Sequence, residues 1–272
     1  MTRGAWILAT FLLTRAGCAA AAGTPLAVWP INAESLAQME KRHPLASAAV
    51  DDPVYKRKQR YEGFWLRDLL KDLSYTGHPE SDVYVRFRCK DGYLPIMPLA
   101  RAMSGQGLVA IRDLGAPPGK DWVSVVANGA SSTPAPSYLV WVSPRGDTEQ
   151  YPWPYQMVAI ELVSSADALG QPVSGGAQKS GAGLFVQHCL KCHAINGAGG
   201  TFGPELNSPC SVTEYWNPDF LSRFITYAGS IRAGTKMPDF RALSGKDIQA
   251  IVAYLRYMGD HKTAGARCQS GR

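Results

Sequence analysis

The chain has 272 residues, of which 46% are hydrophobic and 18% are charged. These fractions are typical of a folded globular protein and exclude a disordered or fibrous chain. The length accommodates two domains of modest size, each able to bury its own core.

The formal net charge of +6 is unevenly distributed along the chain. From Ala177 onward there are 11 Lys and Arg against 6 Asp and Glu, whereas Gly23 to Gly176 has 15 against 16. A basic C-terminal part favours an acidic protein partner, although a basic surface also serves solubility alone. Because the basic residues are scattered instead of forming a stripe, we expect no binding of nucleic acid.

Residues 1–22 have the pattern of a secretory signal peptide, with a basic start, a short apolar run and small residues before the expected cleavage site. Cys18 raises the alternative of a lipoprotein, but Arg15 stands where a lipidation motif has an apolar residue, so this alternative is less favoured. No later stretch is long and apolar enough for a transmembrane segment. We therefore expect an exported, soluble protein of the periplasm.

Residues 23–168 predict a mostly-β (α+β) domain. Segments rich in β-branched and aromatic residues predict strands at Asp82–Cys89, Trp122–Val126, Tyr138–Val142 and Met157–Val163. An amphipathic helix is predicted at Phe64–Leu73, and Asp91-Gly92 predicts a turn. The aromatic side chains of the later strands could line a groove, but sheet core is the favoured use for Trp141, Trp153 and Tyr155.

Residues 169–180 are rich in Gly, Ser and Ala and predict a flexible linker. Helical periodicity follows it. One helix leads into residue 189, a second begins at Asn217-Pro218-Asp219 with Asn as N-cap, and a third begins at a capping box over 244–247 and runs to about Met258. Residues 263–272 are expected to form a tail.

The segment Cys189-Leu190-Lys191-Cys192-His193 is a C-x-x-C-H motif, which is typical of covalent haem attachment. Its two thiols can add to the vinyl groups of one haem, and the histidine then lies under the iron as its proximal ligand. A zinc site would need a second ligand pair at similar spacing, and a thioredoxin-type redox pair would lie at a βαβ junction. Neither context is present in the sequence. The motif therefore predicts haem c, one per chain.

The sixth iron ligand is predicted to be Met237, which lies 44 residues after His193 in a loop between two predicted helices. A thioether that stays bound in both oxidation states suits an electron carrier and favours ferrous iron. His188, His261 or an open site remain as alternatives. Lys191, Arg232 and Lys236 flank the ligand segments and could surround the exposed haem edge.

Residues 181–262 resemble the class I c-type cytochromes. The resemblance is carried by GLFVQHCLKCHAINGAGGTFGPEL, FLSRFITYAGSIRAGTKMPDF and LSGKDIQAIVAYLRYM. It implies the all-α cytochrome c fold, with Phe185 packed against Tyr254 or Leu255. It also implies that the carbonyl of Pro204 accepts the Nδ1 proton of His193 and orients the ring. Ala228-Gly229 departs from the family, since many members have Asn-Pro at this point.

Residues 50–165 are similar, in short pieces, to the molybdopterin-binding domain of sulfite oxidase-type enzymes. The pieces are Y-x-G-x-x-L-x-D-L-L at 61–70, D-G-Y at 91–93 and the strand at 138–141 with Trp153 nearby. Those enzymes bind molybdenum through a loop cysteine, but here Cys89 ends a predicted strand and is interpreted as a buried structural thiol. We therefore expect a degenerate version of that fold and no molybdopterin.

The favoured function is single-electron transfer by a periplasmic monohaem cytochrome, with the N-terminal domain as a docking module. The expected partners are an acidic redox protein or periplasmic dehydrogenase and a respiratory acceptor. The alternatives are a molybdenum oxidoreductase with internal electron transfer to haem, and a haem-based sensor. Cys210 and Cys268 could pair in an oxidising compartment or remain unpaired thiols, and the sequence does not decide between these.

Overall fold

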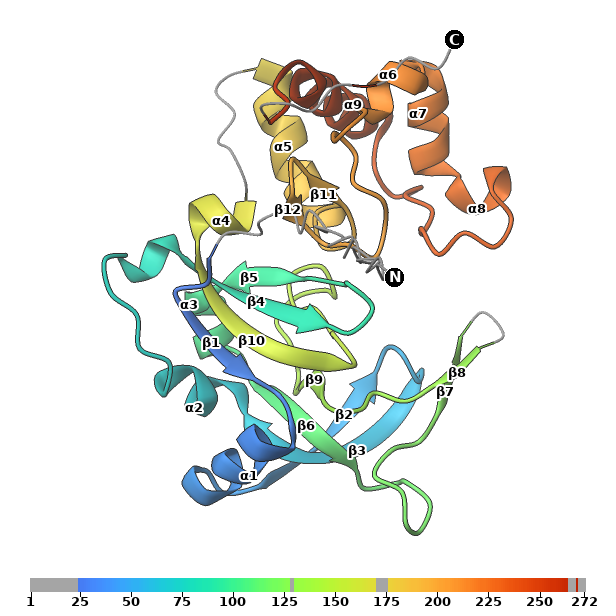
Figure 1. The fold of residues 1–272 in the computed structure, drawn as a ribbon. Coiled ribbons are helices and arrows are strands. Elements are labelled where there is room, and N and C mark those ends of the chain that lie inside the picture. The colour runs from blue at the N-terminus through green and yellow to red at the C-terminus, as the bar shows by residue number, and fades with distance from the viewer. Residues whose placement is uncertain (1–23, 128–129, 170–175, 264–267, 269–272) are drawn as a thin grey trace, which may run out of the picture.

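A computed structural model describes residues 24–127, 130–169, 176–263 and 268. A β-rich N-terminal region and a helical C-terminal region make up the described chain (Figure 1). This confirms the predicted division into a mixed-β part and a helical part. The predicted signal peptide and Cys18 lie outside the described residues.

Two four-stranded antiparallel sheets form the N-terminal region. The first has the order β1 (Ala27–Pro30), β10 (Met157–Ser164), β4 (Val83–Cys89) and β5 (Ile96–Pro98). The second has the order β2 (Ala46–Asp52), β3 (Arg57–Trp65), β6 (Gly107–Asp113) and β9 (Tyr138–Trp141). The remaining elements are the hairpin β7 (Val125–Ala127) and β8 (Ala130–Ser132), a 3₁₀ helix (Glu80–Asp82), α1 (Ala33–Arg42), α2 (Leu66–Lys71), α3 (Leu99–Ser104) and α4 (Ser165–Leu169).

The two sheets share a core. One buried cluster takes side chains from both sheets, among them Phe87 and Ile160 from the first and Phe64, Val109 and Trp141 from the second. Because side chains alternate along a strand, the neighbouring residues of β3, β6 and β9 face the other way and form a second cluster. Trp141 is 1% exposed, so its predicted use in the core is confirmed.

The strands predicted from composition are present as β4, β9 and β10, but two predictions need correction. The strand expected at Trp122–Val126 is reduced to the short β7. The helix expected at Phe64–Leu73 begins only at Leu66, because Phe64 and Trp65 complete β3 and pair with β6. Pairing with a neighbouring strand overrides helical periodicity here. The strands β2, β3 and β6 were not predicted.

The C-terminal region consists of α5 (Gly176–His188), α6 (Val212–Tyr215), α7 (Pro218–Thr226), α8 (Ala228–Ile231), α9 (Gly245–Asp260) and a hairpin of β11 (Ala194–Ile195) with β12 (Ala198–Gly199). The three predicted helices are present as α5, α7 and α9. The hairpin is a short addition to a region that is helical, as expected. Helix α5 begins inside the predicted linker 169–180, of which 170–175 lie outside the described residues.

Local capping and close packing explain the helix ends. Asn217 Oδ1 accepts the Phe220 amide at 2.8 Å, and Ser244 and Asp247 form the predicted capping box. Phe185 packs on Tyr254, with ring centroids 5.2 Å apart, as the family resemblance implied. A side chain at Gly181 would put its Cβ 1.9 Å from the Ala250 carbonyl oxygen, so α5 and α9 approach closely only because of this glycine.

No described helix is both long and apolar enough to cross a bilayer.

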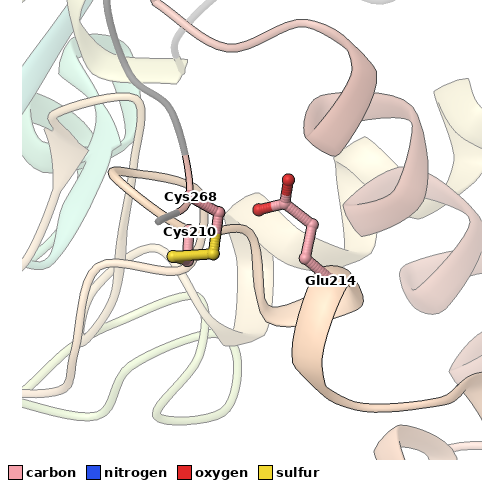
Figure 2. A group of neighbouring side chains, drawn as sticks. All are labelled: Cys210, Glu214 and Cys268. Atoms are coloured by element: carbon pink, nitrogen blue, oxygen red, sulfur yellow. A yellow bond between two sulfur atoms is a disulfide. The ribbon is translucent and has the colours of Figure 1, made fainter. Parts of the chain in front are cut away.

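Cys210 and Cys268 form a disulfide, which decides between the two alternatives left open by the sequence. The bond ties the end of the chain to the loop that precedes α6. Glu214 lies beside it (Figure 2) and pairs with Lys262, which holds the pKa of that carboxyl below its usual range. Because the two sulfurs are bonded to each other, they do not offer thiolates to a metal ion at this group.

Replacing both Cys210 and Cys268 by serine is expected to destabilise the C-terminal region. The bond closes a loop with a sequence separation of 58 residues, and the loss of this constraint on the unfolded chain is worth up to about 4 kcal/mol. Urea unfolding followed by circular dichroism measures the change. An unchanged midpoint relative to the parent protein would show that the bond contributes nothing to stability.

Candidate functional site

The C-x-x-C-H motif lies at the end of α5, beside a cavity of about 650 Å³. The Cys189 and His193 amides donate to the Phe185 and Cys189 carbonyls at 2.8 and 2.9 Å, so two bonds of helical spacing remain in the turns that follow α5. The cavity is lined by both cysteines, His193, Pro204 and Met237. The tertiary structure thus places all five predicted site residues around one space.

His193 is oriented by the loop that follows the motif. Its Nδ1 lies 2.8 Å from the carbonyl oxygen of Pro204, to which it donates a hydrogen bond. Because Nδ1 carries the proton, Nε2 is the nitrogen that can bind a metal. A Cβ at Gly203 would lie 2.5 Å from His193 Cε1, so glycine is required where the loop crosses the ring. Burial lowers the pKa of His193 and favours the neutral imidazole, which is the form that ligates iron.

The two motif thiols are protonated at neutral pH. Burial raises the pKa of Cys189 to about 12 and that of Cys192 to about 11, with the charge of Lys191 opposing the shift in both. They are not paired with each other, although they lie one helical turn apart. Both thiols are free and line the same cavity, which is the arrangement that two thioether bonds to one haem require.

Met237 lies in the loop between α8 and α9, where it is partly buried and lines the same cavity. Two bonds from side chains to backbone shape this loop: Gly229 N–H donates to Asp239 at 2.9 Å, and Met237 N–H donates to Thr235 Oγ1 at 3.2 Å. The departure from the family at Ala228-Gly229 therefore still leaves a well-bonded loop, because Asp239 closes it.

The residues around the cavity fit a haem. The volume is within the range of about 300–1,000 Å³ that is usual for ligand and cofactor pockets. Two thiols, an oriented imidazole and a thioether are the donor set of a haem c with two axial ligands. The remaining walls are largely apolar and include Phe185, Leu206, Val212, Leu221, Phe224, Ile225, Phe240, Ile251 and Leu255.

Sequence reasoning missed that the N-terminal region supplies part of the cavity wall. Tyr93, from the loop between β4 and β5, and Glu149, from the loop between β9 and β10, both line the cavity. In Figure 1 the end of the β4–β5 pair lies next to the β11–β12 hairpin. The signal that could have pointed there was Asp91-Gly92-Tyr93, which was interpreted as a turn.

The turn is present, and it contacts the C-x-x-C-H motif and the loop that follows it. Asp91 accepts the Tyr93 amide at 3.0 Å, and Gly92 has a φ of +88°. The Gly92 carbonyl accepts the Thr201 amide at 2.9 Å, and Leu94 N–H donates to the Lys191 carbonyl at 2.8 Å. A Cβ at Gly92 would lie 2.4 Å from Thr201 Oγ1, so a larger residue would push the two regions apart.

The three basic residues predicted near the haem edge all line the cavity but differ in their contacts. Lys191 pairs with Glu149 and is therefore neutralised within the chain. Lys236 lies 5.5 Å from the centre of the Phe202 ring, and Arg232 is exposed.

Cys89, the other cysteine weighed as a ligand, is part of the N-terminal core. It is 4% exposed, and burial raises its pKa far above the usual value, with Asp91 adding to the shift. A protonated thiol in an apolar core is a poor metal ligand. This agrees with its interpretation as a structural residue.

Comparison with known proteins supports the C-terminal assignment. Residues 176–255 match the family model described as cytochrome C oxidase, cbb3-type, subunit III. The chain is also 30% identical over 102 residues to a protein named cytochrome c from Gibberella zeae, an alignment that covers 31% of this chain and 96% of that protein. Together with the geometry of the motif, this similarity identifies the C-terminal region as a cytochrome c-type domain, associated with haem and electron transfer. Through this region, the chain belongs to the cytochrome c family.

Proposed function

We propose that the protein is a monohaem electron carrier of the periplasm. Cys189 and Cys192 bind the haem covalently, His193 and Met237 are the axial ligands of its iron, and Pro204 orients the histidine. When bound, the haem supplies a one-electron couple. The observation that carries the proposal is the meeting of two thiols, an oriented imidazole and a thioether around one cavity.

The chain's own residues favour fast transfer with little rearrangement. The Pro204 carbonyl fixes the orientation of the His193 ring, and the bonds from Asp239 and Thr235 order the loop that carries Met237. The largely apolar walls lower the polarity around the site, which favours the less charged ferrous form. Both ligands therefore have fixed positions in either oxidation state.

The remaining parts of the proposal concern the organisation of the chain and its partners. Residues 1–22 direct export and are removed. Residues 23–168 form a degenerate sulfite oxidase-type domain without molybdopterin that docks a partner, residues 169–180 connect it, and residues 181–262 form the cytochrome domain, with a tail at 263–272. Electrons pass from a periplasmic dehydrogenase or an acidic redox protein to a respiratory acceptor.

Purified exported protein tests the proposal directly. We expect one iron per chain, a low-spin reduced spectrum, and a haem that stays with the protein in acidified acetone. The native reduced protein is expected not to bind carbon monoxide, because both axial positions are filled. Stoichiometric molybdenum would favour the enzyme alternative, ready binding of carbon monoxide would favour a sensor, and colourless protein would overturn the haem assignment.

A further inference from the structure

The N-terminal region contributes part of the cavity wall, and this indicates that it does more than dock a partner protein. Glu149 belongs to the N-terminal region and precedes Lys191 by 42 residues. Its carboxylate nevertheless pairs with Lys191, which lies between Cys189 and Cys192. It also lies 3.6 Å from Nδ1 of His188. The side chains of this group are mostly shielded, with exposures of 27% for Glu149, 18% for Lys191 and 13% for His188.

Tyr93 extends the same wall. Its ring packs against the N-terminal core and also borders the cavity, so it connects the two regions. The backbone bonds on either side of it, from Thr201 to Gly92 and from Leu94 to Lys191, hold it against the motif. Ile96, in the following strand β5, packs on the cytochrome core.

We infer that Glu149 and Tyr93 belong to the haem pocket and set the reduction potential of the haem, Glu149 through its charge and Tyr93 by covering the cavity. This inference rests on the proposed function, because it assigns the cavity to a haem. The N-terminal region is then a fixed wall of the redox site. Neither residue is an iron ligand; both act on the environment of the site.

The expected directions follow from charge. Ferric haem carries one more positive charge than ferrous haem, so a nearby negative charge favours the ferric form and lowers the potential. Glu149 balances Lys191, and removal of either partner leaves the other charge uncompensated in a partly buried place. The two single replacements must therefore shift the potential in opposite directions.

Redox titration of the holoprotein, followed by the visible spectrum, tests the effect of the Glu149 charge on the reduction potential. Glu149→Gln is expected to raise the potential and Lys191→Met to lower it. Each shift is expected to be about tenfold in the ferrous-to-ferric ratio, or about 59 mV for one electron. The double replacement is expected to return close to the parent value. If the two single variants shifted the reduction potential in the same direction, or if neither shifted it, the inference would be overturned.

Glu62→Gln is the matched control for the charge. Glu62 also belongs to the N-terminal region, is 25% exposed and pairs with an arginine, Arg112, at 2.7 Å, but it does not line the cavity. It is expected to leave the potential unchanged. A shift as large as that of Glu149→Gln would show that any lost ion pair in this region acts on the haem, and the specific role would fail.

The role of Tyr93 in covering the cavity is tested by Tyr93→Ala and Tyr93→Phe. Alanine admits water to the cavity and is expected to lower the potential, whereas phenylalanine keeps the ring and is expected to restore the parent value. Tyr75→Ala, which removes a partly buried ring on the N-terminal core that does not line the cavity, controls for general loosening. If Tyr93→Ala kept the parent potential, or if Tyr75→Ala shifted it equally, the claim that Tyr93 sets the potential by covering the cavity would be refuted.

The two proposals fail in different ways. If the parent protein contains no covalent haem, the proposed function is wrong and these titrations cannot be made. If the haem is present and low-spin but its potential is insensitive to Glu149 and Tyr93, only the present inference is wrong.

Discussion

Replacing Cys189 and Cys192 together by alanine is expected to abolish covalent attachment of the haem. In the proposed site each thiol forms one thioether bond, so the double variant would have only the axial ligands and apolar contacts to hold the group. Any haem retained by the variant is expected to be removed completely by acidified acetone, whereas the parent keeps its colour. The absorbance of the acid-treated protein at the Soret wavelength measures the difference.

Cys89→Ala provides the matched control, because Cys89 is the other unpaired cysteine among the described residues and lies in the N-terminal core. Its loss leaves a small cavity in that core and is expected to reduce stability slightly. The haem must stay attached in this variant. Covalent haem in the double variant, or its loss in Cys89→Ala, would mean that the motif is not the attachment site.

Replacing Met237 by leucine is expected to remove the sixth iron ligand while preserving the volume of the side chain. The absorption band from methionine sulfur to ferric iron should disappear, and the reduced protein should bind carbon monoxide at the open position. The reduction potential should also fall, since the thioether favours ferrous iron. Visible spectroscopy of the oxidised and reduced protein measures these changes.

Met258→Leu is the control for that experiment. Met258 is 3% exposed and belongs to the apolar face of α9, so a replacement of similar volume is expected to cost less than about 1.5 kcal/mol. It should leave the methionine band intact. Persistence of the band in Met237→Leu would assign the sixth position to another residue.

Local chemistry explains which parts of the structure could be predicted. Asn217 and Ser244 cap their helices through side chains that are three residues from their partners, so the helix starts could be read directly. The C-x-x-C-H spacing likewise depends on a single helical turn. Strands β4, β9 and β10 are mostly buried and consist largely of β-branched, aromatic and other apolar residues, and this composition made them recognisable.

The wrongly placed helix start depends on a partner that is distant in the chain. Phe64 and Trp65, which were expected to begin a helix, complete β3 because they pair with Val109 and Leu108 of β6. The same holds for the Cys210–Cys268 bond, whose partners are 58 residues apart. A local pattern contains no information about such pairing energies.

The sequence by itself determined the chemistry of the cytochrome domain, because the attachment motif and helix caps act over a few residues. Only the tertiary structure decided that Met237, His193 and both thiols border one cavity, and that Tyr93 and Glu149 complete its wall. The physical reason is that a turn such as Asp91-Gly92 is specified by local conformational preference, whereas the surface on which it docks is specified by long-range packing. The contact between Gly92 and Thr201 connects segments more than a hundred residues apart, and it exists only once both regions have folded.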